Sequence, residues 1–191
     1  MKIGTAALLL LVPAALAAQQ PQPNTAGGPM STAFRNRYTG LYRLLPQAFD
    51  SIPADKFGYK PTPAQQSIGY VAQHLASDNY FFCNNFGEKK ATLSDEEKAT
   101  PDSVKAMWPK DKLLAGLRAS IAFCQDAYTQ IDDAKLAESI TVTMNNGQTR
   151  QVPRINYVLG HAMDMQDHYS QIANYMRLNG MLPPSALPRP R

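Results

Sequence analysis

The side chains of this protein best suited to chemistry stand near its C-terminal end. Asp164 and His168 are four residues apart, and His161 precedes His168 by seven. Residues four apart on an α-helix share a face one turn apart, so the Asp164 carboxylate and the His168 imidazole can reach one ion. His161 shares that face but lies about 10.5 Å from His168 along the helix axis. We therefore expect Asp164 and His168, without His161, to bind one metal ion.

A third ligand must come from another helix. The only other histidine is His74, which lies between the apolar residues Val71 and Leu75 in a segment of helical periodicity and should point inward. A single histidine on an apolar face is usually a hydrogen-bonded core residue. Two inward histidines and a carboxylate together would be desolvated at several kcal/mol per ionised group without compensation. The sequence therefore predicts a two-His-one-carboxylate metal site of His74, Asp164 and His168.

Four long helices are needed to position these residues. Apolar side chains recur at helical spacing over residues 31–51, 64–86, 110–131 and about 153–180. The charged segment between the second and third helices contains Pro101 and Pro109, so it should hold only short turns, near 94–99 and 103–107. Four helices with one apolar stripe each predict a four-helix bundle, and leave its topology open.

A short hairpin should interrupt the helical pattern before the last helix. Ile140, Val142 and Met144 alternate with polar residues ahead of Asn146-Gly147, a dipeptide typical of tight hairpin turns. A hairpin of this size must lie against the helices to be stable. The expected fold class is all-α, a four-helix bundle with a small β-hairpin excursion before the last helix.

The N-terminal residues read as a secretory signal. Residues 1–18 combine one lysine, a short apolar stretch and an A-x-A-like end. We expect a signal peptide at 1–18, a flexible linker rich in Pro, Gly and Gln at 19–30, the metal-binding bundle at 31–185 and a disordered tail at 186–191. The protein should then be periplasmic or secreted, with no membrane association after signal cleavage.

The two cysteines, Cys83 and Cys124, allow two interpretations. In an oxidising compartment they can form one disulfide, and otherwise they pack as two buried thiols. The sequence contains no C-x-x-C pair, which argues against thioredoxin-like chemistry and covalent haem attachment. A haem held by His and Met ligands remains an alternative that a Soret band would reveal.

Charge gives little information on partners. The 19 basic and 15 acidic residues give a net charge of +4, and the basic residues are scattered. No basic patch is interleaved with aromatic residues, so we expect no nucleic-acid partner. A small-molecule substrate of unknown identity is expected, and a homodimer is compatible with the sequence.

Two segments resemble a known family. HYSQIANYMRLNGMLPPS, residues 168–185, resembles the closing motif of the DinB/YfiT-like superfamily, and QHLASDNYFFCNNF, residues 73–86, resembles its second helix. The resemblance implies a metal-binding bundle with one ligand on helix two and two at i and i+4 on the last helix. Matched by position, these are His74, Asp164 and His168. The family commonly has histidine where Asp164 stands, and a carboxylate favours harder, more general metals such as zinc, nickel, manganese or iron.

The resemblance also bears on function. Characterised members of the superfamily include transferases and isomerases that use small cytoplasmic thiols, which an exported protein would not meet. We therefore predict an exported metal-dependent hydrolase or transferase of unknown substrate, and the alternative is a non-enzymatic metal-binding or stress-related module. Gln171 and His161 are candidates to orient the ligands, and the role of His161 stays open.

Overall fold

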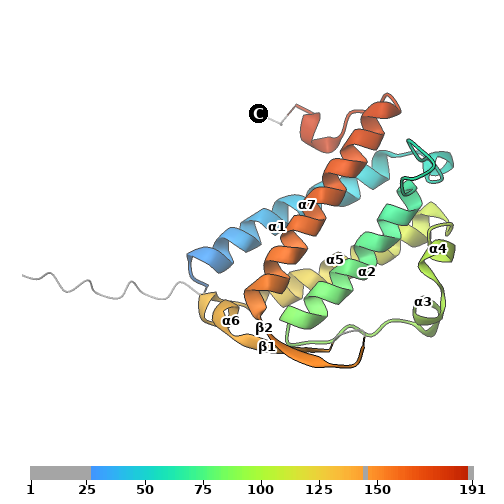
Figure 1. Cartoon of the computed structure of the whole chain (residues 1–191). Helices are drawn as coiled ribbons and strands as arrows, with labels where there is room; N and C mark the ends of the chain where they lie inside the picture. Colours follow the sequence, from blue (N-terminus) through green and yellow to red (C-terminus); the bar gives the residue numbers. More distant parts are fainter. Residues whose placement is uncertain (1–26, 144–145, 189–191) are drawn as a thin grey trace, which may run out of the picture.

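Four long helices form the body of the protein. The structure is a computed structural model that describes residues 27–143 and 146–188. The long helices are α1 (Pro29–Ser51), α2 (Ile68–Phe86), α5 (Lys110–Thr129) and α7 (Arg154–Leu178). They pack as a bundle, with a two-stranded hairpin placed before α7 (Figure 1). The predicted fold class is therefore confirmed.

The helix ends follow local sequence signals, and two helix starts differ from the expectation. α1 begins at Pro29, two residues earlier than expected, because proline is tolerated in the first turn of a helix. α2 begins at Ile68, not at residue 64, because the Ser67 side chain caps the helix by accepting a hydrogen bond from the Tyr70 N–H at 3.1 Å. α7 ends before Gly180, whose φ of +71° suits glycine.

The topology left open by the sequence is resolved by the path of the chain. α2 and α7 run in opposite directions, whereas α2 and α5 run in the same direction (Figure 1). The connection between α2 and α5 must therefore return along the bundle, and it carries the short helices α3 (Asp95–Ala99) and α4 (Asp102–Lys105). The bundle thus contains one crossover connection, and α2 lies between α5 and α7.

A disulfide joins the two parallel helices. Cys83 of α2 and Cys124 of α5 are bonded, their Cα atoms are 5.4 Å apart, and both side chains are fully buried. One turn earlier on each helix, the Asn79 amide donates to the Ser120 hydroxyl at 2.8 Å. The structure thus favours the disulfide over two free thiols, and the bond fixes how α2 and α5 align.

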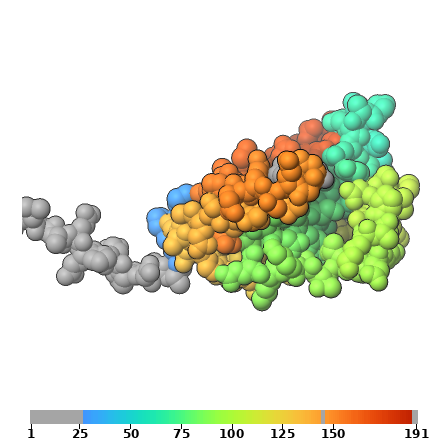
Figure 2. Space-filling view, turned by 60° about the horizontal axis from the view of Figure 1, so that its bottom comes forward, coloured from blue at the N-terminus to red at the C-terminus, as the bar shows by residue number. Residues whose placement is uncertain are grey.

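The hairpin closes one end of the bundle. β1 (Ser139–Thr143) and β2 (Thr149–Pro153) pair antiparallel, and Val142 and Val152 are their buried residues. In the space-filling view from this end, the hairpin lies over the bundle beside the start of the crossover (Figure 2). Met144 of the predicted alternation lies outside the described residues. The turn contains Gly147 at φ +78°, as Asn-Gly predicts.

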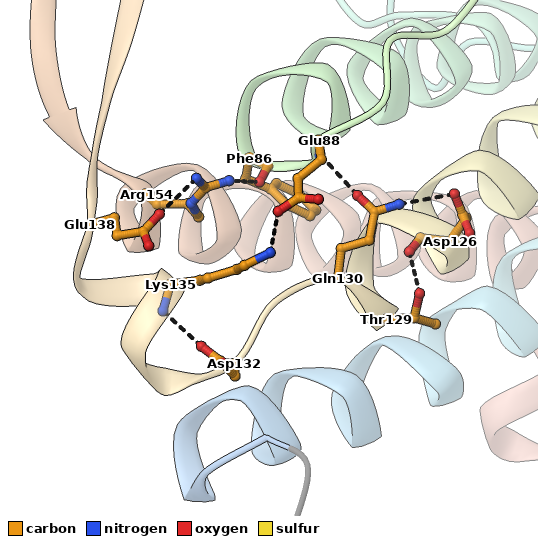
Figure 3. Close-up of polar contacts among 9 residues, drawn as sticks. All are labelled: Phe86, Glu88, Asp126, Thr129, Gln130, Asp132, Lys135, Glu138 and Arg154. Carbon is orange, nitrogen blue, oxygen red and sulfur yellow. Dashed lines mark hydrogen bonds and ion pairs between the residues drawn. The ribbon is translucent and has the colours of Figure 1, made fainter.

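A polar network ties the hairpin end together. Arg154, the first residue of α7, donates to the Phe86 carbonyl at the end of α2 and pairs with Glu138 at 3.1 Å (Figure 3). Lys135 pairs with Glu88, whose N–H donates to the Gln130 side chain at 2.9 Å. Lys135 lies in α6 (Asp133–Ala137), a short helix that sequence periodicity did not predict. The network holds the start of α7 against the end of α2.

Parts of the predicted domain organisation lie outside the residues that the structure describes. The predicted signal peptide at 1–18, most of the predicted linker and residues 189–191 of the predicted tail lie outside the described residues. Within residues 27–143 and 146–188, no helix is both long and apolar enough to cross a membrane.

Candidate metal centre

The three predicted ligands lie together, and a fourth acidic residue joins them. One ligand atom from each of His74, Asp78, Asp164 and His168 lies within 4.8 Å of the other three. His74 and Asp78 stand one turn apart on α2, and Asp164 and His168 stand one turn apart on α7. The structure therefore brings together the proposed ligand set and adds Asp78, which the sequence analysis did not single out.

Each helix contributes one His–Asp pair with the same geometry. The His74 Nε2 lies 3.3 Å from Asp78 Oδ2, and the His168 Nε2 lies 3.3 Å from Asp164 Oδ1. The two imidazole rings meet edge to face with their centroids 4.9 Å apart. All four donor groups thus face one space between α2 and α7.

The orientation of His168 is fixed from its other nitrogen. The His168 Nδ1 lies 3.0 Å from the Gln171 side-chain oxygen, which accepts its proton. The Gln171 amide donates to the Tyr175 hydroxyl at 3.0 Å, and that hydroxyl donates to the Gln66 carbonyl at 3.2 Å. This chain of hydrogen bonds engages Nδ1, so that Nε2 faces the cluster beside Asp164, as is typical of a metal-binding imidazole.

The local charges are strongly coupled. Burial raises the pKa of Asp78 to about 6, and the Asp164 charge and hydrogen bond add to the rise, while the charges of His74 and His168 lower it. Burial lowers the pKa of His168, but hydrogen bonds to Asp164 and Gln171, with the Asp164 and Asp167 charges, raise it overall above its usual value. Two carboxylates held this close require a proton or a cation between them.

One buried atom tests whether these residues fit a metal ion. Asp164 Oδ2 is buried, and no N–H donor in the described chain reaches it. Its neighbour on α2 is the Asp78 carboxyl group, so this oxygen needs a proton shared with Asp78 or a cation, and without either it costs on the order of 1–3 kcal/mol. A divalent cation bound by two imidazole nitrogens and carboxylate oxygens would satisfy this atom, and that donor set suits zinc, nickel, manganese and iron. The residues therefore fit a divalent transition metal.

His161 belongs to a different cluster. Its Nε2–H donates to the Asn79 side-chain oxygen at 2.7 Å, and its Nδ1 accepts from the Tyr128 hydroxyl at 3.2 Å. The ring is fully buried, and burial lowers its pKa to about 3. His161 is thus a hydrogen-bonded core residue, and of the two candidates for orienting the ligands only Gln171 contacts one of them.

The four-residue cluster is partly exposed to solvent. The side chains of His74 and Asp78 retain 27% and 23% of their exposure. A shallow surface depression of about 810 Å³ borders Asp164 and is lined by residues that include Phe82, Gly160 and Met163. Of the four clustered residues, Asp164 is the one that lines this depression.

Comparison with known proteins supports the family suggested by the two segments. The sequence profile of the DinB superfamily matches residues 37–172, which include all four clustered residues. The chain belongs to the DinB superfamily. No curated protein matches its sequence at a significant level.

Solved structures share the fold of this DinB-superfamily chain. A DinB-like protein from Bacillus cereus ATCC 10987 aligns with a TM-score of 0.61 and 16% identity, over 82% of this chain and 97% of that one. A protein assigned to the DinB family from Exiguobacterium sibiricum 255-15 aligns with a TM-score of 0.56 and 21% identity, over 81% and 94%. A mycothiol-dependent maleylpyruvate isomerase aligns with a TM-score of 0.55 and 14% identity, over 75% of this chain and 59% of that longer one.

Proposed function

We propose that this DinB-superfamily protein binds one divalent transition-metal ion through His74, Asp164 and His168. The observation that carries the proposal is the Asp164 carboxylate: its Oδ1 lies 3.3 Å from His168 Nε2, and its buried Oδ2 lacks an N–H donor. A structural core histidine has protein partners for its ring nitrogens, as both nitrogens of His161 do. The four clustered residues instead place their potential ligand atoms within 4.8 Å of one another.

We further propose that the bound metal supports hydrolysis or group transfer on a small molecule. A divalent metal with three protein ligands lowers the pKa of a bound water or thiol and polarises a substrate oxygen. Gln171 would hold the His168 ring in place, and the depression beside Asp164 would admit the substrate. One structural neighbour is a mycothiol-dependent isomerase, and its thiol is not carried over to this chain, because an exported protein would not meet small cytoplasmic thiols.

Metal analysis of the purified protein tests the first proposal. The protein is stripped with a chelator, reconstituted separately with zinc, nickel, manganese and iron, and desalted before elemental analysis. We expect about one equivalent of at least one metal per chain. Less than a tenth of an equivalent of every metal would overturn the proposal.

Turnover separates an enzyme from a metal-binding module. Stripped and reconstituted protein are compared on activated esters, with and without a small thiol. An enzyme should show metal-dependent turnover that His168→Ala abolishes. Stoichiometric metal without turnover on any of these substrates supports the alternative, a non-enzymatic module.

Export is a separate proposal. The disulfide between Cys83 and Cys124 supports it, because such bonds persist in oxidising compartments. When the whole chain is expressed in a bacterium with a periplasm, the mature protein should be recovered there with an N-terminus near Gln19. Recovery of an uncleaved chain in the cytoplasm would contradict this proposal.

A further inference from the structure

We propose that Asp78 is a fourth protein ligand, so that the site is a pair of matching His–Asp arms instead of a three-residue set. The inference rests on the proposed metal-binding function and deepens it. The superfamily resemblance assigns one ligand to α2, whereas this chain places two donor groups on that helix. Asp78 would therefore be a departure of this chain from the family pattern, like Asp164.

α2 and α7 carry matching His–Asp pairs. α2 carries His74 followed by Asp78, and α7 carries Asp164 followed by His168, at the same four-residue spacing. Since α2 and α7 run in opposite directions, the order of the two types is reversed along the chain but matched in space (Figure 1). Imidazole faces imidazole, and carboxyl faces carboxyl. Each arm presents the same two donors to the space between the helices.

A close helix contact one turn further along maintains this register. A Cβ atom added at Gly160 would lie 2.9 Å from the Phe82 ring, so α7 approaches α2 closely at this point. Gly160 precedes Asp164 by four residues, and Phe82 follows Asp78 by four. The residue pairs Phe82–Gly160, Asp78–Asp164 and His74–His168 thus form three successive rungs between the helices.

Each carboxylate faces the Nε2 atom of the histidine on its own helix. A carboxylate that only orients a metal-bound histidine binds the ring nitrogen that does not bind the metal. On His168 that outer position, Nδ1, is taken by Gln171. Asp78 faces the Nε2 of His74, as Asp164 faces the Nε2 of His168, and both distances are 3.3 Å. Asp78 therefore lies inside the ligand set.

A second carboxylate would also balance the charge of a divalent cation. Two carboxylates and two neutral imidazoles around a divalent cation give a net charge of zero, which favours binding in a partly buried site. With Asp164 alone, the site would retain one uncompensated positive charge. The second carboxylate removes it with a donor that the fold already places within 4.8 Å of the other three ligand atoms.

Asp78 would then decide which metals can support chemistry. Four protein ligands complete the tetrahedral coordination that zinc prefers in closed structural sites. Manganese and iron take more ligands, so they would keep positions for water and substrate. The zinc form should therefore be inert, whereas the manganese or iron form should remain open.

Two variants that remove the same charge test the inference. Asp78→Asn removes a ligand, and Asp167→Asn removes an exposed charge that acts on His168 from outside the ligand set. Competition titrations with zinc and manganese should show at least about a 100-fold loss of affinity in Asp78→Asn, because changes in outer partners already cost 10- to 100-fold. Asp167→Asn should change affinity less than about 3-fold.

A spectroscopic readout distinguishes a ligand from an orienting residue. Cobalt-loaded protein reports its coordination through visible absorption bands, which are intense for four-coordinate and weak for six-coordinate cobalt. Asp78→Asn should change these bands, and formate added to Asp78→Gly should restore them by entering the vacated position. Thermal unfolding of the metal-free variants checks that each one folds.

The outcomes separate this inference from the proposed function. If the wild-type protein binds no metal, the proposed function fails and this inference fails with it. If the wild-type protein binds metal but Asp78→Asn matches Asp167→Asn in affinity and in the cobalt spectrum, only the fourth ligand is overturned. Weaker binding with an unchanged spectrum would also overturn it, because Asp78 would then act only by orienting His74.

Discussion

α7 carries two histidine clusters that contrast in how their polar atoms are satisfied. Around His161 both ring nitrogens have protein partners, Asn79 and Tyr128, and the ring is fully buried. Around His168 the donor atoms of two helices face one another, and one oxygen of Asp164 lacks an N–H donor. Both histidines lie on the same stripe, so their position on the helix does not reveal their role. The hydrogen-bond partners of the ring nitrogens distinguish the two roles.

The largest expected difference between the clusters is in metal affinity. His168→Ala should lower affinity by more than about 100-fold, since it removes a ligand, whose loss should exceed that of an outer partner. His161→Phe should change affinity less than about 3-fold. It should instead lower the free energy of unfolding by about 2–4 kcal/mol, because Asn79 and Tyr128 lose their buried partner. Titration calorimetry and urea unfolding of the chelator-treated proteins measure the two effects, and equal losses of affinity would contradict the contrast.

Removing the disulfide, which lies beside the His161 cluster, should lower the stability of the protein but leave its metal affinity nearly unchanged. The Cys83→Ala/Cys124→Ala double variant should lose about 4 kcal/mol of unfolding free energy by the chain-entropy estimate for a loop of this length. Its metal affinity should stay within about 3-fold of wild type, because the ligands lie on α2 and α7 alone. Urea unfolding and metal titration in parallel check this. A loss of metal affinity as large as the loss of stability would show that the clusters are not independent.

The two clusters should respond to acid with opposite sign. His161 has a folded pKa of about 3, against about 6.5 when unfolded, so its contribution to stability is lost as pH falls below about 6.5. Asp78 has a raised folded pKa of about 6, so in the metal-free protein its ionised form destabilises the fold at pH 7, and this cost is removed as pH falls through about 6. Between pH 7 and pH 4.5, wild type should lose about 2–3 kcal/mol relative to His161→Phe, since Asp78 contributes equally to both. Urea unfolding at the two pH values measures the difference, and parallel curves would refute it.

The smallest expected effect concerns the orientation of His168. Gln171→Ala removes the acceptor of the His168 Nδ1 proton and should weaken metal binding about 10-fold. Gln166 lies on the same helix and bonds Ser170 and Arg37 outside the cluster, so Gln166→Ala is a matched control. Metal titration compares the variants. An equal effect of the two changes would show that Gln171 does not position the ring.

Much of the fold could be predicted from periodicity. The apolar stripes predicted the four long helices, and Asn-Gly predicted the hairpin, because each signal is local. The start of α2 was predicted too early, since the decisive signal is the single cap at Ser67. α6 was missed because its five residues are too few to show a period. The direction of α5 depends on how the crossover packs, which the helix patterns do not encode.

The candidate site was predicted only in part for a similar reason. Helical spacing placed Asp164 and His168 on one face, and Asp78 stands at the same spacing from His74. The repeated His–Asp spacing is present in the sequence, but it indicates a second pair of ligands only when the two helices are antiparallel neighbours. The bonding partners of His161 come from α2 and α5, at separations that no local pattern specifies.

The placement of the two His–Asp arms on α2 and α7 would also affect the rate of unfolding. α2 and α7 are separated along the chain by the crossover, α5 and the hairpin, so the arms meet only when a long loop of chain closes. We expect this contact to form after the rate-limiting step of folding, in which case an ion held by both arms would slow unfolding and leave the folding rate nearly unchanged. In this protein the ion would slow the unfolding of a bundle that has already formed.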